Sequence, residues 1–270
     1  MALDTLITGS NLDAGGNIKV ALTNDEAYVG AVRLMSENDD GSITGEPYLK
    51  SPETSPDYRL RVGVDTVMFT DTFNATTQNT NLWSYTAATL TCTQPGGYLQ
   101  FGTVQGTANA HGAFMRSFQY FPVVGTAPLS VEFRGGVYTA QLASGEIFIA
   151  GLGLPGSAIL APTDGVWFKL TSAGLIGELV YNNTATQTGV LASSLTLAEM
   201  AKFVLVVGEE EIEFWVDDVL MGEISVPHAN GQPFMQGSLP VFMQRYNTGV
   251  VSNTSVIRVS DVTVSMMDLA

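Results

Sequence analysis

Apolar and polar residues alternate in short runs along most of the chain, which is the period-two pattern of β-strands with one buried face. The clearest case is residues 204–226, where apolar side chains alternate with Glu211, Glu213 and Trp215. Two aspartates at residues 217–218 then stand where a two-residue hairpin turn belongs, because Asp tolerates a positive φ and bonds its own backbone. This stretch predicts two antiparallel strands joined by a tight turn.

Similar runs continue to the end of the chain, with Gly, Pro, Asn or Asp between most of them. The predicted strands cover residues 88–93, 98–103, 113–118, 129–137, 146–152, 166–171, 175–181, 203–207, 211–216, 219–226, 240–245 and 255–266. Residues 194–200 predict one short helix, capped by Ser194 or Thr196. Strands at this spacing are typical of an antiparallel β-sandwich.

The first 65 residues differ from the rest of the chain. Residues 36–57 contain three prolines and little apolar surface, so this segment cannot bury enough to fold alone. We expect residues 1–65 to form an N-terminal arm that is ordered by packing on its own body or on a neighbouring subunit. A flexible leader without a role is the alternative. The sandwich is expected over residues 66–270.

Composition and charge narrow the function classes. The net charge of −15 and the pI near 4.3 argue against nucleic acid or an anionic membrane as a partner, since both require Lys/Arg clusters. The chain contains no run of about 18 apolar residues, so the sequence predicts no membrane span. No signal peptide is recognisable at the start, so we expect synthesis in a cytoplasm. Cys92 is the only cysteine, which excludes an intrachain disulfide. Because it alternates with Thr91 and Thr93 along a predicted strand, we expect it to be a small buried apolar residue.

Two phrases carry a resemblance to a known fold. FWVDDVLMG between two strands resembles the late hairpin of concanavalin A-like jelly rolls, a superfamily that includes laminin-G-like modules, legume-type lectins and family-16 glucanases. DTFN…NLWSY is similar to the opening of such domains, in which aromatic residues close one end of the core; here these are Phe69, Phe73, Trp83 and Tyr85. The resemblance implies an all-β, antiparallel jelly-roll β-sandwich preceded by an extended N-terminal arm.

The candidate ligand-binding residues are Trp215, Glu211, Glu213 and Tyr181, with a glycan as the ligand. Strand alternation places Glu211, Glu213 and Trp215 on one wet face, where the aromatic ring can stack on a sugar. Family-16 glucanases carry a Glu-x-Asp-x-Glu pattern on such a strand. The corresponding acids here are Glu209, Glu211 and Glu213, so the middle acid is Glu instead of Asp, and Glu209 is expected in a turn. A solvated edge whose charges discourage aggregation is the alternative explanation of these acids.

Metal and nucleophilic chemistry have weaker support in the sequence. Residues 37–40 before Gly41 supply carboxylate and amide oxygens, so calcium stays open, although the spacing is not that of an EF-hand. The two histidines, His111 and His228, form no triad spacing with a nucleophile. The sequence therefore predicts no cofactor, no catalytic residue and no enzyme.

A second resemblance concerns the kind of protein. GNIKVALTNDEAYVGAVRLMSENDDGS and TDTFNATTQNTNLWSY are similar to stretches in proteins of tailed-bacteriophage particles. This resemblance implies a virion structural protein, either a capsid decoration (cement) protein or a head or tail fibre subunit. Residues 1–60 would attach it to a major capsid or tail protein, and the subunit would form a homo-oligomer such as a trimer. The alternatives are a carbohydrate-binding module for host adhesion and, behind it, a family-16-like glucanase.

Overall fold

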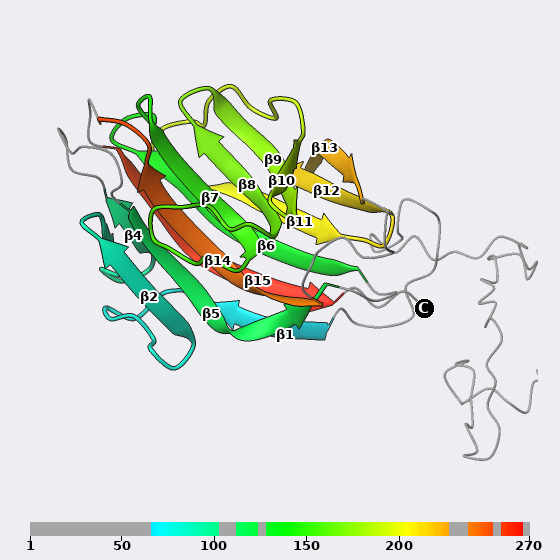
Figure 1. The fold of residues 1–270 in the computed structure, drawn as a ribbon. Helices are drawn as coiled ribbons and strands as arrows, with labels where there is room; N and C mark the ends of the chain where they lie inside the picture. Colours follow the sequence, from blue (N-terminus) through cyan, green and yellow to red (C-terminus); the bar gives the residue numbers. More distant parts are fainter. Residues whose placement is uncertain (1–65, 103–111, 124–127, 227–236, 251–254, 267–270) are drawn as a thin grey trace, which may run out of the picture. The chain divides into compact units, whose positions relative to one another are not determined.

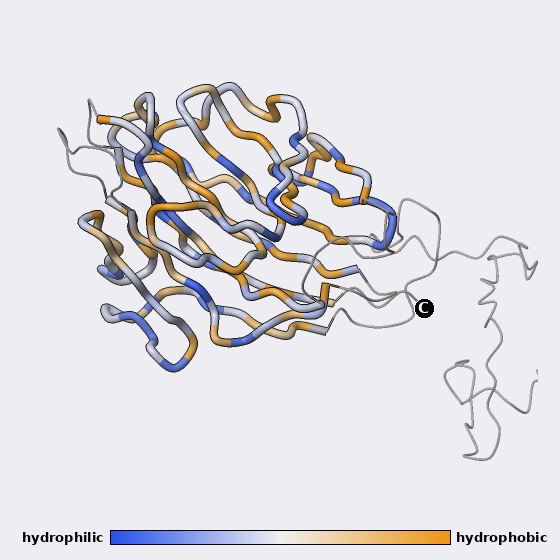
Figure 2. The backbone as a smooth tube through the Cα atoms, in the orientation of Figure 1, coloured by the Kyte–Doolittle hydropathy of each residue, from blue (hydrophilic) through white to orange (hydrophobic). Residues whose placement is uncertain are grey.

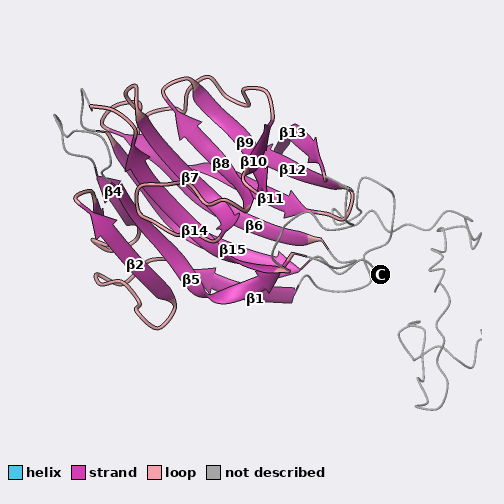
Figure 3. Cartoon of the chain, in the orientation of Figure 1, coloured by secondary structure: helices cyan, strands magenta, loops and turns pink. Residues whose placement is uncertain are grey.

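The computed structural model describes residues 66–102, 112–123, 128–226, 237–250 and 255–266 (Figure 1). The predicted arm, and with it the attachment through residues 1–60, lies outside these ranges. Within them every regular element is a β-strand (Figure 3), as the alternating pattern predicts. None of the described segments forms a helix long and apolar enough to cross a membrane.

The strands form two antiparallel sheets. The eight-stranded sheet has the order β13-β12-β11-β6-β15-β4-β3, with β1 paired to β15 as well. The seven-stranded sheet has the order β10-β9-β8-β7-β14-β5-β2. The strands of the first sheet are β1 (Thr66–Asp71), β3 (Thr91–Thr93), β4 (Leu99–Gly102), β6 (Leu129–Tyr138), β11 (Ala201–Val207), β12 (Glu211–Val216), β13 (Val219–Ser225) and β15 (Val256–Met266). Those of the second are β2 (Trp83–Ala88), β5 (Gly112–Pro122), β7 (Glu146–Gly153), β8 (Gly165–Thr171), β9 (Gly174–Tyr181), β10 (Thr184–Gln187) and β14 (Ser238–Asn247).

The main core lies between the two sheets and is built from every second residue of the strands. In β8, for example, Val166, Phe168 and Leu170 point into this core. Each such side chain contributes roughly 1.5–3 kcal/mol by leaving water. In Figure 2 hydrophobic stretches run along the strands, while many of the turns are hydrophilic. The sheets therefore pack as a sandwich, which confirms the predicted fold class.

The aromatic phrase near the start of the sandwich closes one end of the core, as predicted. Phe69, Phe73 and Trp83 are all buried, and the Trp83 ring meets Phe69 edge-on with 5.3 Å between centroids. Tyr85 differs from the prediction, because it remains 38% exposed and its hydroxyl accepts a hydrogen bond from the Cys92 backbone N–H. Cys92 itself is buried, which raises the pKa of its thiol and leaves it protonated rather than nucleophilic.

The local predictions failed where loop packing overrides propensity. The helix expected over residues 194–200 is absent: this segment is irregular, Leu197 forms a parallel bridge to Val137, and Ala198 has a φ of 62°. The strand expected over residues 88–93 is broken at Thr89, whose φ is 78°. Strands β1 and β10 were not predicted, nor was β2 except for its last residue, Ala88. The hairpin turn was predicted correctly, since both aspartates at residues 217–218 have a positive φ.

One charged pair lies inside the core and ties β7 to β14. The Arg245 Nη2 donates to Glu146 Oε1 at 2.7 Å, and both side chains are fully buried. Ser255 and the Phe101 carbonyl accept further hydrogen bonds from the same guanidinium. Burial lowers the pKa of Arg245, and the charge of Glu146 opposes that shift. These bonds hold together β7, the central strand of the seven-stranded sheet, and its neighbour β14.

Candidate functional site

Three of the four predicted ligand-binding residues lie together on the outer face of the eight-stranded sheet. They come from β12, whose alternate residues Ile212 and Phe214 are buried in the core. Glu211 is exposed, whereas Glu213 and Trp215 are half-buried, and the Trp215 indole N–H donates to Glu213 at 2.7 Å. The predicted solvent-facing side of β12 is therefore confirmed, and Glu213 on it already has an intramolecular partner.

Tyr181 does not join this group. It lies at the end of β9 in the seven-stranded sheet, where it is paired with Thr184 of β10. Its parity along β9 is that of Leu175 and Leu179, which point into the core between the sheets. The structure thus separates Tyr181 from the Trp215 face, and glycan binding by these candidate residues stays a prediction.

The outer face of the seven-stranded sheet was not singled out by the sequence, yet it is the more structured of the two. Strand register aligns one residue from each strand into a row that crosses the whole sheet. We call it the central row: Gln187, Glu178, Trp167, Gly151, Phe242, Arg116 and Ser84. Because directly paired residues of antiparallel strands point to the same side, all of these share the outer face.

A carboxylate with three donors occupies one end of this row. Glu178 is 3% exposed and accepts hydrogen bonds from the Trp167 indole N–H at 2.9 Å, from Lys169 Nζ at 2.8 Å and from the Gln187 side-chain amide. The negative charge is thus stabilised by one cation and two neutral donors. Burial, together with this charge, raises the pKa of Tyr246 to about 12. Sequence reasoning missed this network, although Lys169 and Glu178 are the charged residues of otherwise apolar strands.

The opposite end of the row is open to solvent. On β5, Arg116 is half-buried, Phe118 is 56% exposed and Tyr120 is 46% exposed. Arg116 and Tyr120 share the outer face, since they pair with Phe242 and Pro240, two residues apart on β14. Exposed aromatic residues on the same strand as an arginine are typical of a binding surface rather than of a plain solvated sheet.

The middle of the row is covered. Trp167 and Phe242 are fully buried and meet edge-to-face with 5.7 Å between centroids. Together with Ile149, Val180 and Tyr246 they form a second, smaller hydrophobic cluster on the outer side of the sheet. The loop between β7 and β8 supplies the cover, and Ala161 of this loop packs against the cluster.

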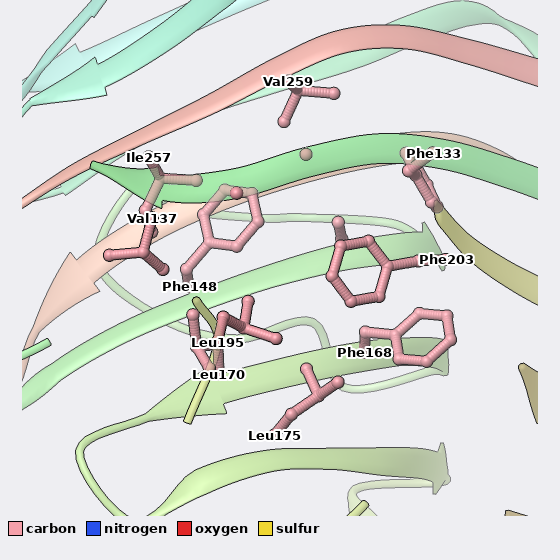
Figure 4. Close-up of a pocket in the computed structure, with 13 residues that line it drawn as sticks. Phe133, Val137, Phe148, Phe168, Leu170, Leu175, Leu195, Phe203, Ile257 and Val259 are labelled. Carbon is pink, nitrogen blue, oxygen red and sulfur yellow. The ribbon is translucent and has the colours of Figure 1, made fainter. Parts of the chain in front are cut away.

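A cavity of about 40 Å³ lies elsewhere, between the two sheets (Figure 4). Its walls are apolar and include Phe133, Phe148, Phe168, Leu175, Phe203 and Val259. A cavity without polar groups cannot hydrogen-bond a sugar, and cavities of this kind stay dry. It is therefore a packing defect of the core rather than a glycan site.

Metal binding finds no support in the described part of the chain, where no three His, Cys, Asp or Glu side chains gather closely enough to hold an ion. The oxygen-rich residues 37–40, the basis for calcium, lie outside the described ranges. So do both histidines, His111 and His228. Calcium binding therefore remains untested.

Comparison of the whole structure with solved structures identifies the fold. An endo-acting O-glycanase of human gut bacteria, described as initiating mucin breakdown, superposes with a TM-score of 0.59 at 13% identity, covering 75% of this chain and 100% of that one. The laminarinase from Rhodothermus marinus gives 0.58 at 15% identity, covering 77% and 100%. The carbohydrate recognition domain of Emp47p gives 0.52 at 12% identity, covering 73% and 94%. No protein-family model matches the sequence, and a search of curated proteins finds no match.

These likenesses confirm the concanavalin A-like jelly-roll sandwich, and at such low identity they establish the fold alone. They also bear on two functional expectations. The prediction that the chain is not an enzyme is wrong, because its fold is shared with an O-glycanase and a laminarinase, which are glycan-cleaving enzymes by name. No protein named as part of a phage particle appears among these similar structures, so the second resemblance gains no support.

Proposed function

We propose that the protein is a glycan-active module that binds its glycan on the outer face of the seven-stranded sheet. The observation that carries this proposal is the open end of the central row, where the exposed Tyr120 shares the outer face with Arg116 and the exposed Phe118 lies on the same strand. Aromatic rings offer apolar surface to the C–H faces of a sugar, and a guanidinium donates to its hydroxyl oxygens. Three solved structures of the same fold are named for acting on or recognising carbohydrate, which supports this ligand class.

Glycoside hydrolysis is the second candidate activity. Glycosidases of the common type use two carboxyl groups that flank the scissile bond. Glu178 supplies one buried carboxylate on the same outer face, held in place by Lys169 and Trp167. The covered middle of the row separates it from Arg116, so cleavage there would involve a glycan that approaches from the β10 edge. Release of reducing ends from laminarin or from mucin O-glycans would support this activity, and its loss in Glu178→Gln, with the fold intact by circular dichroism, would assign the carboxylate.

Calorimetric titration with laminarin and with mucin O-glycans tests the binding proposal. We expect Tyr120→Ala and Arg116→Ala each to weaken binding about tenfold, which corresponds to ~1.4 kcal/mol. The matched controls are Trp215→Ala and Glu211→Gln on the other sheet, which should change the affinity less than about twofold. The reverse pattern would return the site to the eight-stranded sheet. Wild-type protein that neither binds nor cleaves any of these glycans would overturn the proposal.

Attachment to a capsid or tail protein through residues 1–60, assembly as a trimer and location in a virion stay predictions. They rest on the resemblance of sequence phrases, and the segment concerned lies outside the described residues. Light scattering of the full chain beside a chain lacking residues 1–60 measures whether this segment mediates assembly. A monomeric mass for each of the two chains would contradict a role for this segment in oligomerisation.

A further inference from the structure

The loop of residues 154–164, which joins β7 to β8, folds back over the outer face of the seven-stranded sheet. We call it the strap. It leaves the sheet after Gly153 and returns at Gly165, and these two glycines are directly paired. A two-residue turn would suffice to connect paired strands at this point. The additional residues therefore serve something other than chain connection.

Specific contacts hold the strap against β14 and β5. The Gln244 side-chain amide donates to two strap carbonyls, those of Ser157 at 2.9 Å and Leu160 at 2.8 Å. The carbonyl of Ala158 lies so close to Gly112 of β5 that a Cβ added to this glycine would be 1.6 Å from the oxygen. Figures 1 and 3 show this loop passing in front of β14. The strap thus extends from the end of β7 across β14 to β5.

The strap crosses the central row and divides it. Gly151 has no side chain, so the rings of Trp167 and Phe242 meet above it. Strap residue Pro162 lies beside the neighbouring Gly153, which Phe242 also contacts. Consequently Phe242 is fully buried, although its neighbour in the row, Arg116, is half-exposed. Apart from the exposed Gln187 at the β10 edge, the row is open from β5 to the sheet edge at β2, a width of two strands or roughly 10 Å.

We infer that the strap makes this a site for glycan chain ends and short glycans rather than for the interior of a long chain. A chain lying on Arg116 and Tyr120 can extend outward past β2, but its inner end meets the strap above Phe242. The inference rests on the proposed function, because it specifies which glycans the same face accepts. The strap is then the element that determines specificity, and Gln244 is the residue that positions it.

Chain-length dependence of binding tests the inference with the wild-type protein. The probes are laminari-oligosaccharides and mucin O-glycans of two to six sugars, titrated by calorimetry. Because only the terminal sugars reach the protein, we expect the affinity to stop rising at about three sugars. An affinity that continues to rise to six sugars would overturn the inference and leave the proposed function intact. No binding at any length would overturn the proposed function itself.

Two variants probe the strap directly. In a variant with residues 155–163 replaced by Asn-Gly, the affinity should rise with each added sugar, by at least tenfold between three and six sugars. This replacement uncovers Trp167 and Phe242 and can prevent folding. Gln244→Met is a milder test, because it removes both hydrogen bonds to the strap. It should raise the affinity for six-sugar glycans about threefold. Trp215→Ala on the other sheet should keep the wild-type plateau. A folded strap variant with an unchanged plateau would contradict the inference.

Discussion

The outer faces of the two sheets have similar alternating sequence patterns but differ in how much they are exposed to solvent. On the eight-stranded sheet, the face stays in water: Lys202 lies 3.6 Å from Glu132 and 2.8 Å from Asp218, and these side chains are all partly exposed. On the seven-stranded sheet, Ile149, Trp167 and Phe242 of the outer face are fully buried. Alternation therefore predicts that a strand has two faces, but it does not predict that the second face is wet.

The connections explain this difference. The hairpin between β12 and β13 closes with a two-residue turn, and the Asp217 carboxylate accepts a hydrogen bond from the Lys202 backbone N–H at 2.9 Å. Such a turn covers nothing. The strap between β7 and β8 instead lies on its own sheet and creates a second apolar layer. A long connection can thus cover part of an outer sheet face that would otherwise be exposed to solvent.

The two tryptophans of the outer faces provide the largest expected contrast. Trp167→Ala should destabilise the protein by about 3–5 kcal/mol, because it leaves a cavity beneath the strap and removes the donor to Glu178. Trp215→Ala, from a half-buried position, should cost about 1 kcal/mol. Urea unfolding of both variants measures the difference. Equal losses would mean that the two faces are energetically alike.

The acids of the two faces should also differ. Glu178→Gln should destabilise by about 2 kcal/mol, because the new amide cannot accept from three donors and Lys169 loses its counter-charge. Glu213→Gln on the other face should cost about 0.5 kcal/mol, since its partner is a single indole N–H. The same unfolding measurement applies. A cost for Glu213→Gln as large as that for Glu178→Gln would contradict the comparison.

Alkaline pH should weaken the seven-stranded face through Tyr246. Burial and the charge of Glu178 raise its pKa to about 12, from about 10 in the unfolded chain. The neutral hydroxyl therefore favours the folded state below pH 10, and this contribution is lost as the pH rises towards 12. Between pH 9 and pH 11 the loss should be about 1 kcal/mol, measured by urea unfolding. Tyr246→Phe should remove this part of the slope; an unchanged slope would exclude Tyr246 as its source.

The smallest effect is expected for the ion pairs of the eight-stranded face. Lys202→Met removes contacts to Glu132 and Asp218, of which Asp218 is 77% exposed. Exposed pairs contribute little, so the loss should stay below about 1 kcal/mol and shrink further in 1 M salt. Thermal unfolding at low and high salt measures it. A larger, salt-independent loss would show that this face is less solvated than its exposure indicates.

Part of the fold could be predicted from the sequence because its signals are local. Alternation identified Ile212 and Phe214 of β12 as core residues, and the two aspartates at residues 217–218 identified a turn that requires positive φ. The helix over residues 194–200 was predicted wrongly, because the packing of Leu197 against Val137 overrides local propensity. For the candidate site, the alternating pattern singled out Trp215 but not Glu178 and Lys169, whose contact depends on the pairing of separate strands.

The sequence by itself determined an all-β sandwich, its tight hairpin and the aromatic closure at Phe69, Phe73 and Trp83, since each depends on neighbours along the chain. Tertiary structure decided the rest. Strand register brought Glu178, Trp167 and Arg116 into one row from segments far apart in sequence, and the strap determined which part of that row meets water. Burial of an outer face depends on whether a loop folds back onto it, and a period-two pattern carries no information about that contact.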